Sequence, residues 1–503
     1  MASKQFKVQL DTATYKGTVS VNTGLFIGGK WVEPVEGGTL DVINPATGKL
    51  VTTVAGGSDK DVDIAVDVAK KAYKTSWGLK VPGVERGKLL NKLANLVEAN
   101  IEELAALESL NAGKPYIMTK NMEIVHACNF LRFFAQQADK IHGETIETSE
   151  QKFAYTRREP YGVVGAITPW NAPLALLCGK VAPAVAAGNV VVAKPSEITP
   201  LTALRFADLI NEAGFPLGVI NIVNGLGSTV GSAIAYHPQI TRLSFTGSTL
   251  TGRKIQEASA KSNLKVVTLE LGGKSPNIIF DDAELEQAIK WSATGVFPNM
   301  GQSCIAGSRI FVQEGIYDKF VAAFQEASKN WSQHTGDPFE PETQHGPQVS
   351  QIQLDRVMGY IDSAKKDGAT IITGGSRHGD TGYFVQPTII TDTRPDMKII
   401  KEEIFGPVAS IIKFKTEEEA IEIANDTTYG LAGGVFTQNN ARAIRVSHAI
   451  EAGMIWVNCY GWPDLTVPFG GYKQSGIGRE LGLDGILEYT QVKGVHVNIG
   501  LKI

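Results

Sequence analysis

The sequence contains few cysteines, almost no excess of either charge sign, and no apolar run long enough for a membrane. Cys128, Cys178, Cys304 and Cys459 lie far apart, so their spacing indicates neither a zinc site nor a redox pair, and we expect no metal. Few cysteines without paired spacing are typical of a reducing compartment, and we expect a cytoplasmic location. The start of the chain, MASKQFKVQL, has no apolar core followed by a cleavage site, so we expect no secretory signal.

The balance of charges excludes two classes of partner. The formal net charge is -4 with both signs interspersed, so the chain offers no basic patch for nucleic acid and no polybasic stretch for a membrane surface. The most apolar stretch, residues 181–193, is interrupted by Pro183, Gly188 and Asn189 and is too short to cross a bilayer. We therefore expect neither nucleic acid nor a membrane as a partner.

What the sequence does contain is enough apolar surface for a large interior. The chain has 503 residues, of which 43% are hydrophobic, and this length exceeds what a single core usually serves. Apolar residues between Glu85 and Leu110 recur at helical spacing, and Gly113 with Pro115 ends the predicted helix. Two large lobes are therefore expected.

Apolar strands and amphipathic helices alternate between residues 162 and 271. This rhythm predicts a parallel sheet covered by helices, and such sheets bind ligands at the carboxyl ends of their strands. The predicted strands are 161–167, 189–193, 219–223, 242–245 and 265–270, and the predicted helices are 173–187, 199–213, 228–235 and 251–259.

A second alternation, from Asp282 to about Phe469, predicts a second α/β lobe. The tail, residues 490–503, alternates apolar and polar residues and predicts an edge strand. Because an isolated edge strand must pair with something, we expect the subunits to assemble. The candidate strands of the second lobe are 308–312, 410–414, 434–436 and 455–457.

Two residues form a candidate nucleophile and base. Cys304 lies in a loop of small residues, GQSC (residues 301–304), which leaves room for a ligand, although a lone cysteine is ordinarily an inert core residue. Glu270 ends an apolar strand beside Gly272 and Gly273, where partial burial would raise its pKa toward that of a general base. The alternative is a glutamate paired with a surface lysine.

Three further stretches follow predicted strands and suit ligand binding. Asn171 can donate its amide to an oxyanion, or it can cap the following helix. Residues 247–252 (GSTLTG) open a helix with glycine and hydroxyl residues, which suits phosphate, although such turns are common. Lys194 and Glu197 either form a solvated pair or hold a ribose, and a carboxylate there favours NAD over NADP.

Taken together, these stretches resemble the aldehyde dehydrogenase superfamily. The resemblance covers essentially the whole chain from Phe26 to the final strand, and it is strongest for NAD-using tetramers that oxidise acetaldehyde, retinal and related aldehydes. The motifs that carry it are TPWN (168–171), KPSEITP (194–200), FTGST (245–249), LELGGKSP (269–276), GQSC (301–304), EEIFGPV (402–408) and PFGGYKQSG (468–476).

The resemblance implies a fold and a division of the chain. The implied fold is α/β, with a Rossmann-type NAD-binding lobe, a second α/β catalytic lobe and a small β oligomerisation element. The implied assembly is a homotetramer, although Gln491 stands where many such tetramers place a glutamate at the subunit contact. The NAD-binding domain would comprise residues 1–140 and 161–271, the catalytic domain residues 272–472, and the oligomerisation element residues 141–160 and 473–503.

The resemblance also implies roles for single residues. Without it, Phe405 would be interpreted as core and Lys180 as surface. The implied catalytic residues are Cys304 as nucleophile, Glu270 as base, Asn171 with the Cys304 amide as oxyanion donors, and Lys180 in a proton relay. The implied cofactor-binding residues are Ile167, Thr168, Pro169, Trp170, Lys194, Glu197, Gly227, Phe245, Gly247, Ser248, Leu271, Glu403 and Phe405.

The chain departs from the family pattern where the substrate would bind. Ala172 and Gly179 stand where short-chain enzymes usually have an aromatic residue and a tryptophan, so we expect a wider tunnel and a substrate bulkier than acetaldehyde. The alternative is that neighbouring side chains collapse inward and keep the tunnel narrow. The expected tunnel residues are Ala172, Ala175, Gly179, Ile305, Trp462 and Phe469.

The sequence therefore predicts an enzyme that oxidises a small-molecule aldehyde to a carboxylic acid with NAD, through a thioester on Cys304, with NADP as the weaker alternative. Relatives that pass the acyl group to coenzyme A typically lack a glutamate at the position of Glu270, so its presence favours hydrolysis. A thiol esterase would use the same two residues, but it has no use for the nucleotide features at Lys194 and Glu197. A third interpretation is a non-catalytic relative that keeps only the fold.

Overall fold

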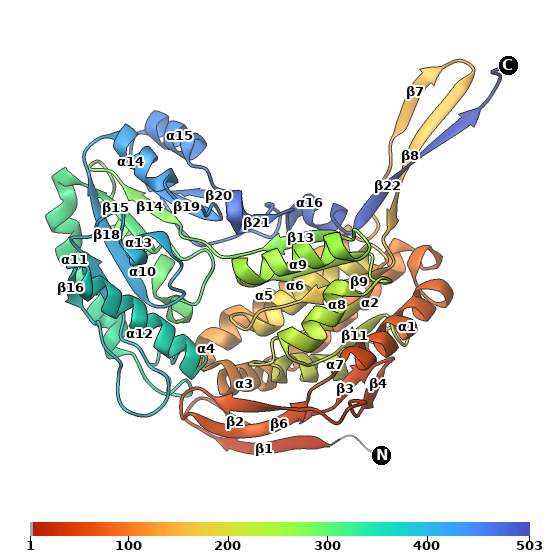
Figure 1. The fold of residues 1–503 in the computed structure, drawn as a ribbon, viewed down its shortest axis with the longest axis horizontal. Helices are drawn as coiled ribbons and strands as arrows, with labels where there is room; N and C mark the ends of the chain where they lie inside the picture. The colour runs from red at the N-terminus through yellow and green to blue at the C-terminus, as the bar shows by residue number, and fades with distance from the viewer. Residues whose placement is uncertain (1–3, 503) are drawn as a thin grey trace.

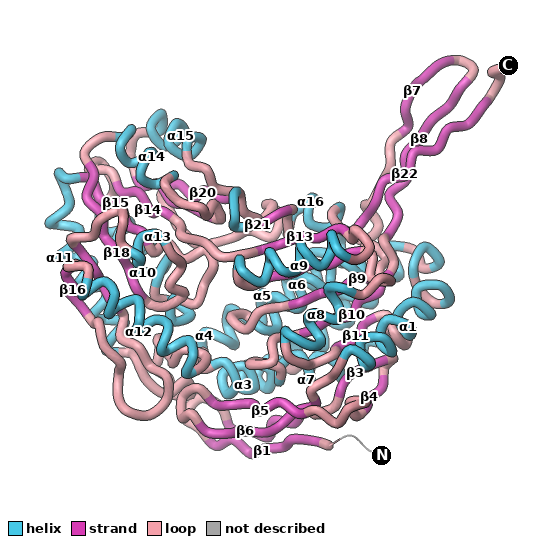
Figure 2. Tube along the Cα trace, in the orientation of Figure 1, coloured by secondary structure: helices cyan, strands magenta, loops and turns pink. Residues whose placement is uncertain are grey.

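Two large sheets organise the computed structural model, which describes residues 4–502 (Figure 1). One sheet has eight strands in the order β21-β13-β12-β9-β10-β11-β3-β4, and the other has seven in the order β16-β17-β18-β15-β14-β19-β20. Helices alternate with the strands and pack around both sheets (Figure 2). The fold is therefore of the predicted α/β class.

The eight-stranded sheet contains all five strands predicted between residues 161 and 270. Its central strands are parallel, as the alternation with helices required. The prediction missed the short strands at its two edges, which come from the N-terminal region and from the C-terminal region. The strands are β9 (Val163–Ile167), β10 (Val190–Lys194), β11 (Ile220–Ile222), β12 (Arg242–Thr246), β13 (Val266–Glu270), β3 (Leu25–Ile27), β4 (Lys30–Val32) and β21 (Gly476–Ile477).

The seven-stranded sheet contains all four strands predicted after residue 282. Three others were missed, because short strands without a polar and apolar alternation give little periodic signal. Of these, β14 begins at Pro276, which is the last residue of the LELGGKSP motif. The strands are β14 (Pro276–Ile279), β15 (Arg309–Gln313), β16 (Thr370–Thr373), β17 (Thr388–Thr391), β18 (Val408–Phe414), β19 (Ala432–Phe436) and β20 (Met454–Val457).

The helix predicted from Glu85 to Leu110 forms as two helices. Asn100 separates them with φ of -108° and ψ of 20°, and its side-chain amide donates to the carbonyl of Leu96 at 2.8 Å. Asparagine competes with helical backbone in this way, which periodicity alone does not register. The second helix ends where predicted, at Gly113 in the left-handed conformation.

Most helices pack against the two sheets or against each other. None of the helices within residues 4–502 combines the length and apolarity that crossing a bilayer requires. The helices are α1 (Asp59–Thr75), α2 (Gly83–Ala99), α3 (Ile101–Ala112), α4 (Tyr116–Met118), α5 (Ile124–Gln137), α6 (Pro173–Ala186), α7 (Leu201–Ala213), α8 (Ser232–Tyr236), α9 (Thr249–Lys261), α10 (Leu285–Val296), α11 (Tyr317–Gln333), α12 (Gln351–Lys366), α13 (Lys398–Lys401), α14 (Glu417–Asn425), α15 (Asn440–Ala449) and α16 (Gly482–Leu487).

A three-stranded sheet projects from the body as an arm, with the C-terminal strand along it (Figure 1). Strand β22 (Thr490–Asn498) pairs antiparallel with β8 (Lys152–Pro160), which pairs in turn with β7 (Thr145–Ser149). Within the described part of the chain the outer edge of β22 pairs with no strand. The predicted terminal edge strand is thus present. Two hairpins, β1 (Gln5–Asp11) with β2 (Lys16–Asn22) and β5 (Thr39–Asn44) with β6 (Lys49–Ala55), complete the fold.

Candidate functional site

The polar motifs meet at one edge of the eight-stranded sheet. Strand pairing places Ile167 beside Lys194 and beside Phe245, and it places Thr246 beside Glu270. Because these strands are parallel, their carboxyl ends lie together. The stretches predicted to bind ligand at strand ends therefore share one site.

Cys304 lies at a cavity of about 140 Å³ between the two sheets. The residue as a whole is partly exposed, but its thiol is surrounded by protein. This burial raises the pKa of the thiol to about 12, and the nearby carboxylates of Glu403 and Glu270 add to the shift. The thiol is therefore protonated at neutral pH and needs a base for activation. The other residues around this cavity include Pro169, Trp170, Asn171, Gly247, Ser248, Leu271, Glu403 and Phe405.

Asn171 is tied to the nucleophile loop rather than to a helix end. Its side-chain amide donates to the carbonyl of Gln302 at 3.1 Å. The residue at the start of α6 is Ala172, whose side chain cannot cap it, so the capping interpretation of Asn171 is wrong. The amide lies at the cavity that contains Cys304, where an oxyanion donor is needed.

A left-handed turn shapes the nucleophile loop, and the sequence did not reveal it. Asn299 and Met300 have φ of 51° and 57°, a region that residues with side chains rarely adopt. The Asn299 amide donates to the carbonyls of Asn171 at 2.9 Å and Gln302 at 3.0 Å. This side chain therefore links Asn171 to the loop that contains Gln302 and Cys304.

Glu270 is buried and unpaired. It is 3% exposed, and within residues 4–502 neither carboxylate oxygen has a hydrogen-bond partner. Burial raises its pKa well above the usual value, Glu480 raises it further, and Lys180 and Arg479 oppose the shift. The alternative interpretation, a glutamate paired with a surface lysine, is therefore wrong. A carboxylate in this setting suits a general base near neutral pH.

Lys180 is fully buried on α6, which corrects its interpretation as a surface residue. Its ammonium pairs with Glu480 and donates to the Ser244 hydroxyl at 3.0 Å. Lys180 is thus not in direct contact with Glu270, but its charge acts on the pKa of that carboxylate. A fully buried lysine is uncommon unless it is paired, and here the pair is Glu480.

Lys194 and Glu197 form an ion pair at the end of β10. The distance from the Lys194 ammonium to the Glu197 carboxylate is 2.9 Å, and Lys194 is 2% exposed. Burial alone would raise the pKa of Glu197, but the pair with Lys194 outweighs it and lowers that pKa. The lysine of this pair is therefore buried, so the alternative interpretation of a solvated pair is wrong for Lys194. Glu197 faces a cavity of about 660 Å³ that Ile167, Gly227 and Phe245 also line.

Ser248 and Glu403 both line the smaller cavity. Ser248 caps α9 by accepting from the amide of Thr251 at 3.3 Å. Glu403 accepts from the amide of Gly273 at 3.0 Å, and burial raises its pKa to about 7. Phe405 packs edge-on against Trp170, with ring centroids 5.2 Å apart. Phe405 therefore lines the cavity, and its interpretation as a core residue is wrong. Thr168 and Lys194 are buried.

A third cavity of about 240 Å³ adjoins the nucleophile loop on the opposite side of Asn171. Of the six expected tunnel residues, Ala172 and Ile305 line it. Ala175 and Gly179 are buried in α6, and a Cβ at position 179 would lie 3.8 Å from the Phe130 ring. Trp462 is 63% exposed, with its neighbour Gly461 at the cavity instead, and Phe469 pairs by backbone with Glu480.

Two sets of buried charges were missed by the sequence interpretation. Lys114 pairs with Glu123 at 2.6 Å and lies 3.9 Å from Glu108, and two of these three line the third cavity. Lys274, in the LELGGKSP motif, is 1% exposed, and its amine makes no hydrogen bond within the described chain. The sequence feature that could have identified Lys274 is its position directly after Gly272 and Gly273, in the same motif as Glu270.

Comparisons with known proteins agree with this geometry. The family model described as the aldehyde dehydrogenase family matches residues 31–495. An aldehyde dehydrogenase of Agaricus bisporus is 56% identical over 99% of both chains, and one of Emericella nidulans is 56% identical over 95% of both. The structure of the NAD+ complex of aldehyde dehydrogenase from Bacillus cereus matches with a TM-score of 0.93 and 46% identity, covering 95% of this chain and 96% of that one. The chain therefore belongs to the aldehyde dehydrogenase family.

Proposed function

We propose that this enzyme oxidises an aldehyde to a carboxylic acid with NAD, through a thioester on Cys304 that a Glu270-activated water hydrolyses. One observation carries the proposal: Cys304, Asn171 and Glu403 line a single cavity, and Glu270 is held nearby with both oxygens unpaired within the described residues. The bound NAD+ in the similar Bacillus cereus structure supports the choice of cofactor.

The first bond forms between the Cys304 sulfur and the aldehyde carbon. Because burial keeps the thiol protonated, its proton must leave as the sulfur attacks. The carboxylates of Glu403 and Glu270 both act on the thiol, and we assign the base to Glu270, whose oxygens make no hydrogen bond within the described residues, whereas Glu403 already accepts from Gly273. The carbonyl oxygen becomes an oxyanion, for which the Asn171 amide and the Cys304 backbone amide are the donors.

The polar groups that line the cavities of about 140 and 660 Å³ suit a dinucleotide. The N-terminus of α9 at Ser248 suits a diphosphate, Glu197 suits a ribose hydroxyl, and Glu403 suits the second ribose beside Cys304. When bound, the nicotinamide supplies a hydride acceptor for the substrate carbon, which leaves a thioester on Cys304. Glu270, after releasing the thiol proton, takes a proton from the water that attacks the thioester; the carbon–sulfur bond breaks, the Cys304 thiolate takes up a proton to restore the thiol, and the acid leaves.

The preference for NAD over NADP rests on Glu197. Its carboxylate faces the larger cavity and also accepts weakly from the amide of Gly227, at 3.4 Å. A 2′-phosphate would meet this negative charge, and Lys194 is already paired with it. We therefore expect higher kcat/KM with NAD, and NADP as the weaker substrate.

An absorbance assay for NADH with an aldehyde panel tests the proposal. The parent enzyme should form NADH with NAD, and Cys304→Ala should lower the rate by about a thousandfold or more. A thiol esterase would hydrolyse activated esters without forming NADH from aldehydes. Equal rates for the parent and Cys304→Ala would remove the cysteine from the mechanism.

A substrate bulkier than acetaldehyde is a separate proposal. It is supported by Ala172, whose small side chain lines the cavity of about 240 Å³. The glycine at 179 contributes less, because Phe130 already occupies the neighbouring space. Ala172→Phe should lower kcat/KM for a benzaldehyde-type substrate about tenfold and leave acetaldehyde nearly unchanged. A parent enzyme that clearly prefers acetaldehyde would refute the wide tunnel.

We also propose a homotetramer in the cytoplasm. The outer edge of β22 supports assembly, since Val492 and Ile499 on the C-terminal segment are 58% and 59% exposed. All four cysteines are free, which suits a reducing compartment. Light scattering after size-exclusion chromatography would measure the assembly, and a monomer that remains stable at micromolar concentration would contradict it.

A further inference from the structure

Two separate stretches of chain contribute most of the lining of the third cavity, of about 240 Å³. One is the nucleophile loop, in which Gln302 and Ser303 directly precede Cys304. A molecule that fills this cavity therefore reaches from the nucleophile loop to the second stretch. The second stretch contributes Lys114, Pro115, Met118, Thr119, Met122 and Glu123.

The polar part of the second stretch is an ion pair. The Lys114 ammonium lies 2.6 Å from the Glu123 carboxylate, and the two side chains are only 8% and 16% exposed. The Thr119 hydroxyl already donates its proton to the carbonyl of Pro115 at 3.0 Å. Lys114 and Glu123 are therefore the groups of this stretch that can recognise a polar ligand in the cavity.

Glu123 belongs to an unusual piece of backbone. A π-helical turn, η2 (Thr119–Glu123), lies between α4 and α5, and the amide of Ile124 donates to the carbonyl of Thr119. Such turns are rare, and many of them lie at functional sites. Thr119, Met122 and Glu123 of this turn all line the cavity. The irregular backbone therefore coincides with the contact between this helix and the cavity.

The ion pair leaves hydrogen-bonding capacity unused. One oxygen of Glu123 accepts from Lys114, but the other is buried and has no partner within residues 4–502. The Lys114 ammonium has three donors and makes one hydrogen bond in the described chain, to Glu123. The nearest Glu108 oxygen is 3.9 Å away, which is too far for a hydrogen bond. The pair therefore retains both an acceptor and donors.

A hydroxyl group matches this pair better than a charged group does. Glu123 would repel a carboxylate, and Lys114 would repel an ammonium. Glu108 adds no charge near neutral pH, because burial raises its pKa to about 8. A hydroxyl can donate to one partner and accept from the other. We propose, on the basis of the function proposed above, that the aldehyde substrate carries a hydroxyl group that donates to Glu123 and accepts from Lys114.

The pair should select against an aldehyde that lacks this hydroxyl. An apolar group at the same place would displace water from the pair without replacing its hydrogen bonds. The second oxygen of Glu123 and the remaining donors of Lys114 would then stay buried and unpaired, which weakens binding. Sites that hydrogen-bond a substrate hydroxyl discriminate strongly against analogues without it for this reason.

Substrates that differ by a single group test the proposal. The meta and para isomers of (hydroxymethyl)benzaldehyde are compared with those of ethylbenzaldehyde, which carry a methyl group in place of the hydroxyl. NADH absorbance gives kcat/KM for each aldehyde, and the ratio of the hydroxymethyl to the ethyl substrate is the hydroxyl preference. For the better isomer we expect a preference of about tenfold or more in the parent enzyme.

Variants of Glu123 should lower this preference in a graded way. Glu123→Met removes the acceptor and should bring the preference close to one. Glu123→Gln keeps a neutral acceptor oxygen and should retain roughly a threefold preference, since hydrogen bonds to neutral groups are weaker. Thermal melting checks that the variants fold, and the nearly isosteric Glu123→Gln decides if Glu123→Met does not.

The same helix offers a matched control pair. Glu102 lies 2.6 Å from Lys120 of the π-helical turn, the two side chains are 63% and 32% exposed, and neither residue lines the cavity. Glu102→Met and Glu102→Gln break an ion pair to the same turn outside the cavity. Both should keep the hydroxyl preference of the parent.

Three results would overturn the inference. A preference near one in the parent for both isomers would show that the cavity does not recognise a hydroxyl. A full preference in both Glu123 variants would place the hydroxyl elsewhere, and an equal loss in the Glu102 variants would assign the pair a structural role. The absence of NADH with every aldehyde would instead refute the proposed function, and the inference would fall with it.

Discussion

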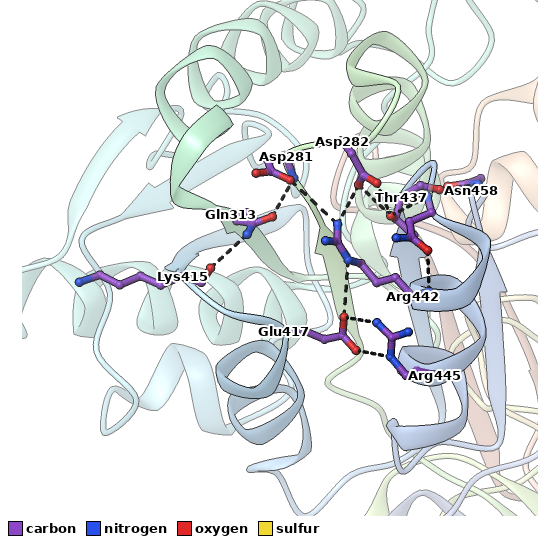
Figure 3. A network of polar contacts seen from close by, with 10 residues as sticks. Asp281, Asp282, Gln313, Lys415, Glu417, Thr437, Arg442, Arg445 and Asn458 are labelled. Carbon is purple, nitrogen blue, oxygen red and sulfur yellow. Dashed lines mark hydrogen bonds and ion pairs between the residues drawn. The ribbon is translucent and has the colours of Figure 1, made fainter.

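Two groups of charged residues in this enzyme differ in how they are satisfied. On the surface of the second lobe, Arg442 lies between Asp282 and Glu417, with nitrogen–oxygen distances of 3.1 and 3.5 Å (Figure 3). Glu417 also receives two hydrogen bonds from Arg445, and Asp282 accepts from the Thr437 hydroxyl at 2.7 Å. Every carboxylate in this network has a partner, and the network joins α14, α15 and the loop after β14.

Two buried groups, Glu270 and Lys274, differ from this network and from the buried pairs Lys180–Glu480 and Lys194–Glu197. Glu270 is buried with no hydrogen bond to residues 4–502, and Lys274 is likewise buried without one. Burial raises the pKa of Glu270 and lowers that of Lys274 to about 7. Such groups cost stability and persist because the surrounding fold holds them. The paired charges of the Arg442 network contribute to the stability of the fold, whereas Glu270 has both oxygens available for its proposed role as a base.

The same substitution in both regions should give opposite results. Glu270→Gln should lower turnover about a hundredfold or more, because the general base is lost, and it should leave the thermal midpoint unchanged or higher. Glu417→Gln should leave turnover within about twofold and lower the midpoint, because two arginines lose their partner. NADH formation and scanning calorimetry measure the two effects. A large loss of stability in Glu270→Gln would contradict this division of roles.

A second test compares how much Arg442 and Arg445 each contribute to the free energy of unfolding. Arg442→Met should lower the free energy of unfolding by about 1–3 kcal/mol, since the arginine bridges two carboxylates over the Phe280 ring and its side chain is only 24% exposed. Arg445→Met is the matched control, and because Arg445 is 58% exposed it should cost about 1 kcal/mol or less. Urea unfolding provides both values. Equal costs would show that burial does not decide the effect.

The smallest effect concerns pH and the buried carboxyl of Glu108. Burial raises its pKa to about 8, so the folded chain keeps a proton that the unfolded chain loses near the ordinary value of 4.5. Stability from this group is complete below that value and is lost as the pH rises toward 8. Glu108→Gln, which is permanently neutral, should reduce the fall in thermal midpoint between about pH 5.5 and 8.5 by a few degrees. Parallel curves for parent and variant would exclude Glu108.

Local sequence predicted the elements that carry strong periodicity. The five parallel strands between residues 161 and 270 were found, and so was the terminal edge strand, because each has an apolar pattern and clear ends. The break at Asn100 and the short strand β14 were missed, since neither changes the periodic pattern. The structure places Glu270 at the end of β13 and Asn171 after β9, as the sequence predicted, and their roles stay predictions.

Other features of the site depend on contacts between distant segments, which no local pattern contains. Only the family resemblance gave Lys180 a role, and without it the residue would have been interpreted as surface; in the structure it pairs with Glu480, three hundred residues along the chain. Asn299 gave no sequence signal, and its role follows from the left-handed turn and from the amide bonds to Asn171 and Gln302.

The sequence by itself determined the family, through motifs that span the chain, and the family implies the class of chemistry, whereas the thiol, the carboxylate and the amide alone left a thiol esterase open. Only the tertiary structure decided how these groups are protonated. The pKa values of Cys304 and Glu270 follow from burial and from charges on other segments, and both arise when the two sheets and the C-terminal segment pack together.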